Sequence, residues 1–191
     1  MENEKKRSPL QKYLDSKPGL EDTINRTLVG DKKKNALNFV AWLQESKLVP
    51  KINRGTYNDW ESHYKNKPIC GIGLPRSGIS DGIWTVRLRL IYMDSYSETI
   101  LSEGLQGIIL DTARSCDFSE SDYKKNANCR TPKSCAPGKS VTILGKSFVN
   151  LCGLKVRFEN PDEVIFNAIK QLLELEKQAR DVYYLKNKQN K

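Results

Sequence analysis

The stretch Ile83-Trp-Thr-Val-Arg-Leu-Arg-Leu-Ile-Tyr92 decides the fold class of this 191-residue chain. Large apolar side chains alternate along it with other residues, which is the period of a β-strand that buries one face. One predicted face carries Trp84, Val86, Leu88, Leu90 and Tyr92, and the other carries Thr85, Arg87, Arg89 and Ile91. A strand with one buried and one partly wet face is typical of an antiparallel sheet.

The segments around this strand complete an α+β pattern. Turn residues and apolar periodicity predict further strands at 57–64, 68–74, 141–144 and 148–158. They predict helices at 95–114 and from Pro161 to about Tyr184. Because the strands are joined as hairpins without crossover helices, we expect an antiparallel sheet of about five strands packed against helices.

The chain is expected to be one domain with short additions at both ends. Residues 1–34 are predicted to form a helical N-terminal extension, 35–185 a single α+β domain, and 186–191 a basic tail. A membrane span needs about 18 consecutive apolar residues, and a secretory signal needs an apolar segment near the N-terminus. The sequence has neither pattern, which predicts a cytoplasmic protein without a membrane partner.

Positive charge is concentrated in one region of the chain. The formal net charge is +9, and residues 116–160 contribute +4 of it. Polyanions are attracted to basic surfaces through counterion release. However, the sequence has no nucleic-acid-binding motif, and a solvated basic surface explains the same charge. Nucleic acid is therefore a second-rank candidate partner.

Four cysteines bracket a polar segment at 117–139. They are Cys116, Cys129, Cys135 and Cys152, separated by 12, 5 and 16 residues. Four thiolates can hold a structural zinc ion, which would order a loop of this length. The spacing lacks the paired C-x2-C of a zinc ribbon, so ordinary unliganded thiols are the alternative.

The same region carries a resemblance to a known family. The segments Cys135–Lys139, Ile143–Phe148, Asn150–Cys152 and Arg157–Asp162, together with Trp84–Arg89, resemble an uncharacterised family of small cysteine-containing proteins from Gram-positive gut bacteria. The resemblance covers about residues 36–180. This chain spaces its cysteines more widely than that family does, which weighs against a shared metal site. At the level of topology alone, the predicted fold is similar to gyrase-inhibitor-like effector-binding domains, which bind small molecules between sheet and helices.

The single histidine is predicted to lie beside the remaining cysteine. A hairpin turn at Asn66-Lys67 places His63 opposite Cys70 on the neighbouring strand. A thiol next to an imidazole is the arrangement of an activated nucleophile, so a Cys70-dependent enzyme is one hypothesis. The alternative is a histidine and a cysteine packed as ordinary sheet neighbours. No third group that orients the imidazole is identifiable in the sequence.

Two arginines on the central strand give the leading functional hypothesis. Arg87 and Arg89 share a face, and guanidinium groups bind anions bidentately, although pairing with nearby acids is the alternative. We therefore expect a non-enzymatic binding domain for an anionic small molecule, with aromatic walls from Trp60, Trp84 and Tyr92. A polyanion- or protein-binding module, ordered by zinc at the cysteines, is the alternative.

Overall fold

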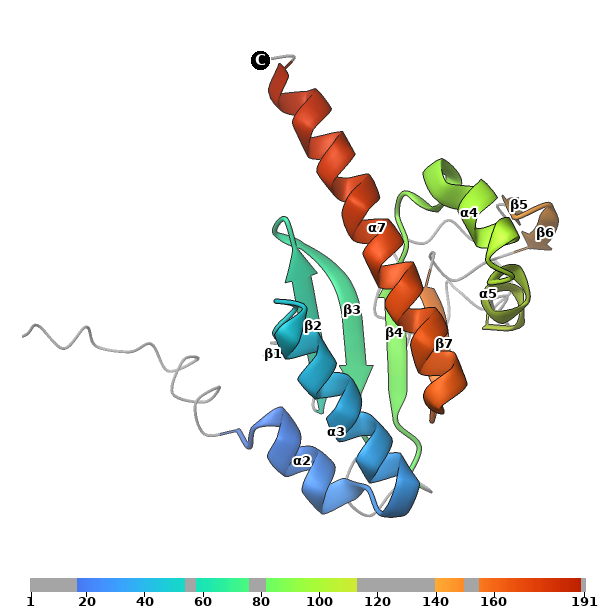
Figure 1. Cartoon of the computed structure of the whole chain (residues 1–191). Coiled ribbons are helices and arrows are strands. Elements are labelled where there is room, and N and C mark those ends of the chain that lie inside the picture. Colours follow the sequence, from blue (N-terminus) through green and yellow to red (C-terminus); the bar gives the residue numbers. More distant parts are fainter. Residues whose placement is uncertain (1–16, 54–57, 76–81, 113–139, 150–154, 190–191) are drawn as a thin grey trace, which may run out of the picture. The chain divides into compact units, whose positions relative to one another are not determined.

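A computed structural model describes residues 17–53, 58–75, 82–112, 140–149 and 155–189. The chain divides into two compact units, Met1–Val86 and Arg87–Lys191. The main sheet contains β1 (Lys51–Ile52), β2 (Asp59–Tyr64), β3 (Lys67–Gly73), β4 (Thr85–Arg89) and β7 (Lys155–Glu159). They follow the order β1-β2-β3-β4-β7 (Figure 1). The predicted α+β fold, with an antiparallel sheet of about five strands and an N-terminal helix, is confirmed.

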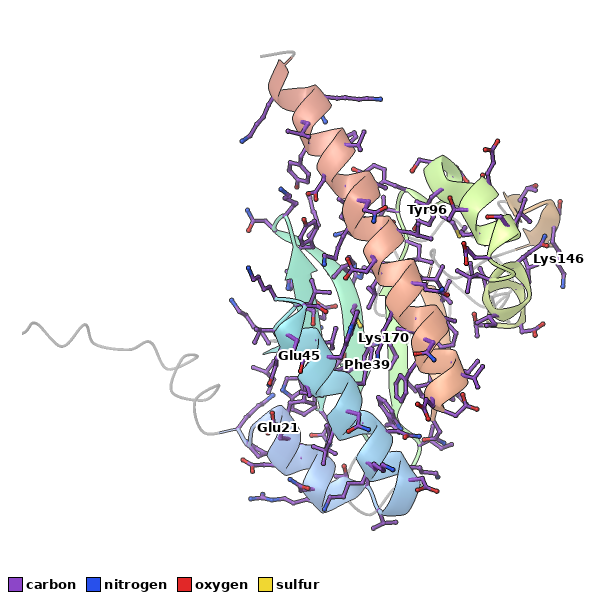
Figure 2. The ribbon with its side chains drawn as sticks, viewed as in Figure 1. Glu21, Phe39, Glu45, Tyr96, Lys146 and Lys170 are labelled. Atoms are coloured by element: carbon purple, nitrogen blue, oxygen red, sulfur yellow. The ribbon has the colours of Figure 1, made fainter. Side chains whose placement is uncertain are left out.

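The first unit begins with two helices, α2 (Leu20–Thr27) and α3 (Gly30–Glu45). The buried face of α3 includes Phe39, which points towards the strands and lies 6.4 Å from the Trp84 ring, measured between centroids (Figure 2). The helix starts at Gly30, so residues 32–34 form its early turns, because lysine is a good helix former.

The β2–β3 hairpin corrects the predicted partner of His63. Lys65 and Asn66 have positive φ angles of 51° and 61°, so they form a two-residue type I′ turn. His63 therefore pairs with Pro68, and an irregularity between Ser62 and His63 then brings Ser62 opposite Cys70. The predicted His63–Cys70 pairing is wrong because the turn lies one residue earlier and a β-bulge shifts the register. His63 is exposed and Cys70 is buried.

The burial pattern of β4 and its flanks agrees with the predicted alternation except at Thr85, which is buried although it was predicted on the partly wet face. Trp84, Val86, Leu88 and Leu90 are buried, whereas Arg87 and Arg89 are half-buried. The strand ends at Arg89, earlier than the sequence predicted. Gly73 on β3 allows a close approach of the backbone to β4, because a Cβ atom there would lie 2.7 Å from Thr85 Oγ1.

The second unit has more, shorter elements than predicted. The expected helix at 95–114 is divided into a 3₁₀ helix η1 (Met93–Tyr96), α4 (Ser97–Ser102) and α5 (Gln106–Thr112). Gly104, with φ +70°, lies between α4 and α5, in a conformation that ends a helix. The strand expected at 148–158 is also two strands, β6 (Lys146–Val149) and β7. The hairpin of β5 (Ser140–Ile143) and β6 is a separate two-stranded sheet.

The last element of the second unit is the long helix α7 (Glu163–Gln189). Asp162 caps it, since its Oδ1 accepts a hydrogen bond of 2.9 Å from the Ile165 amide. The helix continues beyond Tyr184, where the sequence predicted its end. Its buried residues follow the spacing of a helix with one core face: Phe166, Ala168, Ile169, Leu172, Leu173, Glu176 and Arg180. Among the described helices, none is sufficiently long and apolar to cross a membrane.

Two buried hydroxyls in the first unit generate a stability prediction. Ser62 Oγ has no hydrogen-bond partner among the described residues, whereas Thr23 Oγ1 donates to the Gly19 carbonyl at 2.8 Å. A buried hydroxyl without a partner costs about 1–3 kcal/mol of desolvation. We expect Ser62→Ala to raise the free energy of unfolding by about 1 kcal/mol, and Thr23→Val to lower it by about the same amount. Urea unfolding measures both, and a destabilised Ser62→Ala variant would contradict the prediction.

Candidate functional site

A cleft of about 380 Å³ lies in the second unit, between α7 and the segment that contains η1 and the start of α4. This volume is at the small end of the range for protein sites that bind small molecules. Residues from both walls line it: Tyr92, Ser95, Tyr96, Thr99, Leu175, Gln178, Ala179, Val182, Tyr183 and Lys186. The walls are thus mainly aromatic and apolar, with a few polar groups.

Behind this cleft, a buried ion pair connects α7 to the opposite wall. Glu176 and Arg180 are one helical turn apart and almost completely buried, and Arg180 Nε donates to Glu176 Oε1 at 2.7 Å. The other oxygen, Glu176 Oε2, accepts from the Tyr96 hydroxyl at 2.8 Å and from the Tyr92 amide at 3.2 Å. Arg180 Nη2 donates to the Arg89 carbonyl at 3.1 Å. One charged pair therefore holds the end of β4, the following turn and η1 against α7.

Tyr96, labelled in Figure 2, joins this network through its hydroxyl and also lines the cleft. Burial raises the pKa of its phenol well above the ordinary value, and the neighbouring Glu176 carboxylate raises it further. The phenol is therefore a committed hydrogen-bond donor to Glu176. Its oxygen keeps lone pairs with which it can accept a hydrogen bond.

The opposite part of the cleft is aromatic and positively charged. The Tyr92 and Tyr183 rings are 5.0 Å apart between centroids and inclined by 37°. Lys186 also lines the cleft, and its ammonium forms no ion pair within the described part of the chain. Gln178 and Thr99 likewise have side chains without a hydrogen-bond partner among the described residues. No acidic residue is among those that line the cleft, so its polar groups suit an anion.

A second concavity, in the first unit, has the opposite character. It encloses about 310 Å³ beside the first turn of α2, and its lining includes Glu21, Asp22 and Gln44. Gln44 Nε2 donates to Glu21 Oε1 at 3.1 Å, and neither a cation nor an aromatic ring is present in the lining. This concavity offers nothing that would attract an anion.

The sequence-predicted ligand residues are distributed over both units. Trp60 and Trp84 are buried in the core of the first unit. Arg87 and Arg89 lie on the face of β4 opposite Trp84, since each is an odd number of residues away from Trp84 along the chain. Only Tyr92 lines the cleft.

The sequence reasoning missed Glu176, Arg180, Tyr96, Tyr183 and Lys186. Charged residues were assigned to the surface, because isolated buried charges are costly. One signal was present, however. Glu176 and Arg180 continue the spacing of Ile169 and Leu172–Leu173 along α7, so they fall on its buried face.

The predicted zinc ligands Cys116, Cys129, Cys135 and Cys152 lie outside the described residues, so the zinc hypothesis stays a prediction. In the part of the chain that is described, no group of three or more histidine, cysteine or acidic residues could hold a metal ion. The polyanion-binding hypothesis depends largely on the same segment and also stays a prediction.

Comparisons with known proteins found no match among protein-family models, curated proteins or solved structures. The resemblance to the uncharacterised bacterial family and the topological similarity to effector-binding domains therefore remain predictions.

The buried ion pair generates a prediction about stability. Glu176→Gln leaves the Arg180 guanidinium buried without its counter-charge, and we expect it to lower the free energy of unfolding by about 3–5 kcal/mol. The matched control is the more exposed pair Glu174–Lys177 on the same helix, with a distance of 2.9 Å. Glu174→Gln should cost less than about 1 kcal/mol. Urea unfolding compares the variants, and equal losses would show that burial does not determine the effect.

The raised pKa of Tyr96 generates a prediction about alkaline pH. The unfolded phenol ionises near its ordinary pKa of 10.0, while the folded phenol stays protonated to higher pH. The contribution of the Tyr96 phenol to the free energy of unfolding is therefore fully present below pH 10. It decreases as the pH rises towards the pKa of the folded state. For one proton, the free energy of unfolding falls by about 1.4 kcal/mol per pH unit.

Replacement of Tyr96 by a residue without a phenol should remove its part of the decrease in unfolding free energy at alkaline pH. We expect Tyr96→Phe to show a shallower decrease of unfolding free energy above pH 10 than the unmodified protein. Denaturant unfolding at several alkaline pH values measures this, and an unchanged slope in Tyr96→Phe would refute the assignment.

Proposed function

We propose that the second unit binds a small anionic molecule in the cleft between α7 and the η1–α4 segment. The observation that supports this function best is the combination of apolar and aromatic walls, in a cleft of about 380 Å³, with one lysine that has no ion-pair partner among the described residues. Apolar walls provide the favourable burial of a ligand, and a few polar groups fix its orientation. This site assigns to Lys186 the charge recognition that the sequence analysis assigned to Arg87 and Arg89.

The proposed role is binding without catalysis. The Glu176 carboxylate, which accepts a hydrogen bond from the cleft-lining Tyr96, is paired with Arg180 and accepts three hydrogen bonds within the described residues. A general base needs an available lone pair within reach of the substrate proton. The groups that line the cleft without a hydrogen-bond partner among the described residues include the Lys186 ammonium, the Gln178 amide and the hydroxyls of Thr99, Tyr92 and Tyr183, which suit recognition.

The buried network gives the site a preorganised wall. The Tyr92 amide and the Tyr96 hydroxyl both donate to Glu176, so the segment that carries these two tyrosines is fastened to α7 before any ligand arrives. A preformed site loses less conformational entropy on binding than one that must be ordered by its ligand. Tight recognition of a small molecule is therefore compatible with the modest size of the cleft.

Filling the cleft tests the proposal. Ala179 lies on the cleft wall and is half-buried, so Ala179→Trp should occupy the space that a ligand needs. Gln171→Trp adds the same side chain at an exposed position of the same helix and is the control. The binding of indoleacetate, octanoate, adenosine monophosphate and inorganic phosphate is measured by isothermal titration calorimetry.

We expect at least one of these anions to bind saturably to the unmodified protein and to Gln171→Trp. Ala179→Trp should weaken that binding at least about tenfold, because overlap with the ligand removes most of its contacts. Circular dichroism and thermal unfolding verify that both variants are folded. Absence of saturable binding by every anion, or equal affinity in both variants, would overturn the proposal.

A further inference from the structure

We infer that the cleft selects a planar aromatic molecule with a single carboxylate, attached to the ring by a short linker, over phosphorylated ligands. This inference rests on the proposed function and specifies its ligand class. Three features of the site support it: the tyrosine pair, the single cation, and the position of the cleft along α7.

The tyrosine pair provides the surface for a ring. Tyr92 and Tyr183 contact each other at 5.0 Å between centroids, and Tyr183 is 48% exposed, so much of its surface remains available. Aromatic rings prefer offset or inclined partners at such separations. Leu175, Ala179 and Val182 extend the apolar surface along α7 on the same side of the cleft. A flat ligand would cover this wall more completely than a compact polar one.

The charge in the cleft matches one negative charge. Lys186 is the only cationic residue among those that line it, and no arginine is present. Phosphate sites in proteins typically use several donors: guanidinium forks, or backbone amides at a helix N-terminus. The cleft lies against residues 175–186 of α7, where the backbone amides donate within the helix. These features favour a monocarboxylate, for which the Lys186 ammonium suffices.

The electrostatic field of α7 also disfavours a second negative charge. The helix ends at Gln189, so Lys186 lies in its last turn, near the partly negative C-terminal end of the helix dipole. A dianion placed there would be repelled by the unpaired carbonyls of this end. The ammonium compensates one charge against this field, and the described lining offers no second cation.

The spacing of the two recognition groups defines the ligand further. Lys186 follows Tyr183 by three residues, so both project from neighbouring positions on one side of α7. Their Cα atoms differ by about 4.5 Å along the helix axis. A ring that packs on Tyr183 therefore has its carboxylate partner nearby but displaced along the helix, which suits an arylacetate. Indoleacetate is the test ligand because it has a ring, one carboxylate and a one-carbon linker.

Charge-matched ligands and a paired set of lysine variants test the inference. Indoleacetate is compared with tryptophol, its neutral alcohol counterpart, and with tryptamine, its cationic counterpart, by calorimetry. Lys186→Met removes the ammonium but keeps a long apolar side chain, and Lys188→Met does the same at an exposed position outside the cleft lining. Adenosine monophosphate and inorganic phosphate are added as competitors.

We expect indoleacetate to bind more tightly than tryptophol, and tryptamine to bind most weakly. Lys186→Met should weaken the binding of indoleacetate at least about tenfold and the binding of tryptophol by less than about threefold, because only the carboxylate loses a charged partner. Lys188→Met should leave both affinities unchanged. Tyr183→Leu should weaken indoleacetate and tryptophol together, since both lose the same ring contact.

The outcomes separate this inference from the proposed function. Phosphate or adenosine monophosphate could displace indoleacetate, bind more tightly than it does, and lose this binding in Ala179→Trp. In that case the cleft binds anions, but the inferred ligand class is overturned. The same conclusion follows if octanoate binds there and indoleacetate does not. If tryptophol equals indoleacetate in affinity, or Lys186→Met and Lys188→Met have equal effects, the assigned role of Lys186 is overturned. If Ala179→Trp changes no anion's binding, the proposed function itself fails.

Discussion

The buried ion pair between Glu176 and Arg180 is the interaction on which the second unit depends. A buried pair of charges is stabilising only when hydrogen bonds satisfy the remaining lone pairs and protons. Here the carboxylate is satisfied by the Tyr96 hydroxyl and the Tyr92 amide, and the guanidinium also reaches the Arg89 carbonyl. Because these partners belong to three consecutive parts of the chain, the pair determines where the segment after β4 lies on α7. The cleft exists because that segment is held there.

Most of the fold class was predictable from the sequence, because it depends on local periodicity. The alternation from Trp84 to Leu90 required a strand with one buried face, and the burial of these residues agrees with it. Register was less predictable. A type I′ turn at Lys65-Asn66 and one bulge were enough to exchange the partners of His63 and Cys70. Neither feature changes the apolar pattern strongly, so periodicity could not detect them.

The candidate site was only partly predictable, for a different physical reason. Tyr92 was identified because it follows the central strand, but Trp60 and Trp84 are core residues. Pattern reasoning treats aromatic residues near a sheet as candidates for both roles and assigns charged residues to the surface. Glu176 and Arg180 violate the second assumption because they compensate each other. Such a pair is recognisable only when the helical spacing of the apolar residues is continued through the charges.

The position of the ion pair on α7 also affects how the helix itself is stabilised. Before Arg180 the helix is held by buried apolar side chains, whereas Val182, Tyr183 and Leu185 are about half exposed or more. Isolated helical turns are marginally stable in water, so these last turns depend mainly on their continuation from the buried part. They also form a large share of the cleft wall. Any ligand that packs on Tyr183 and Lys186 would therefore reduce fraying, and amide hydrogen exchange after Arg180 would slow when the cleft is occupied.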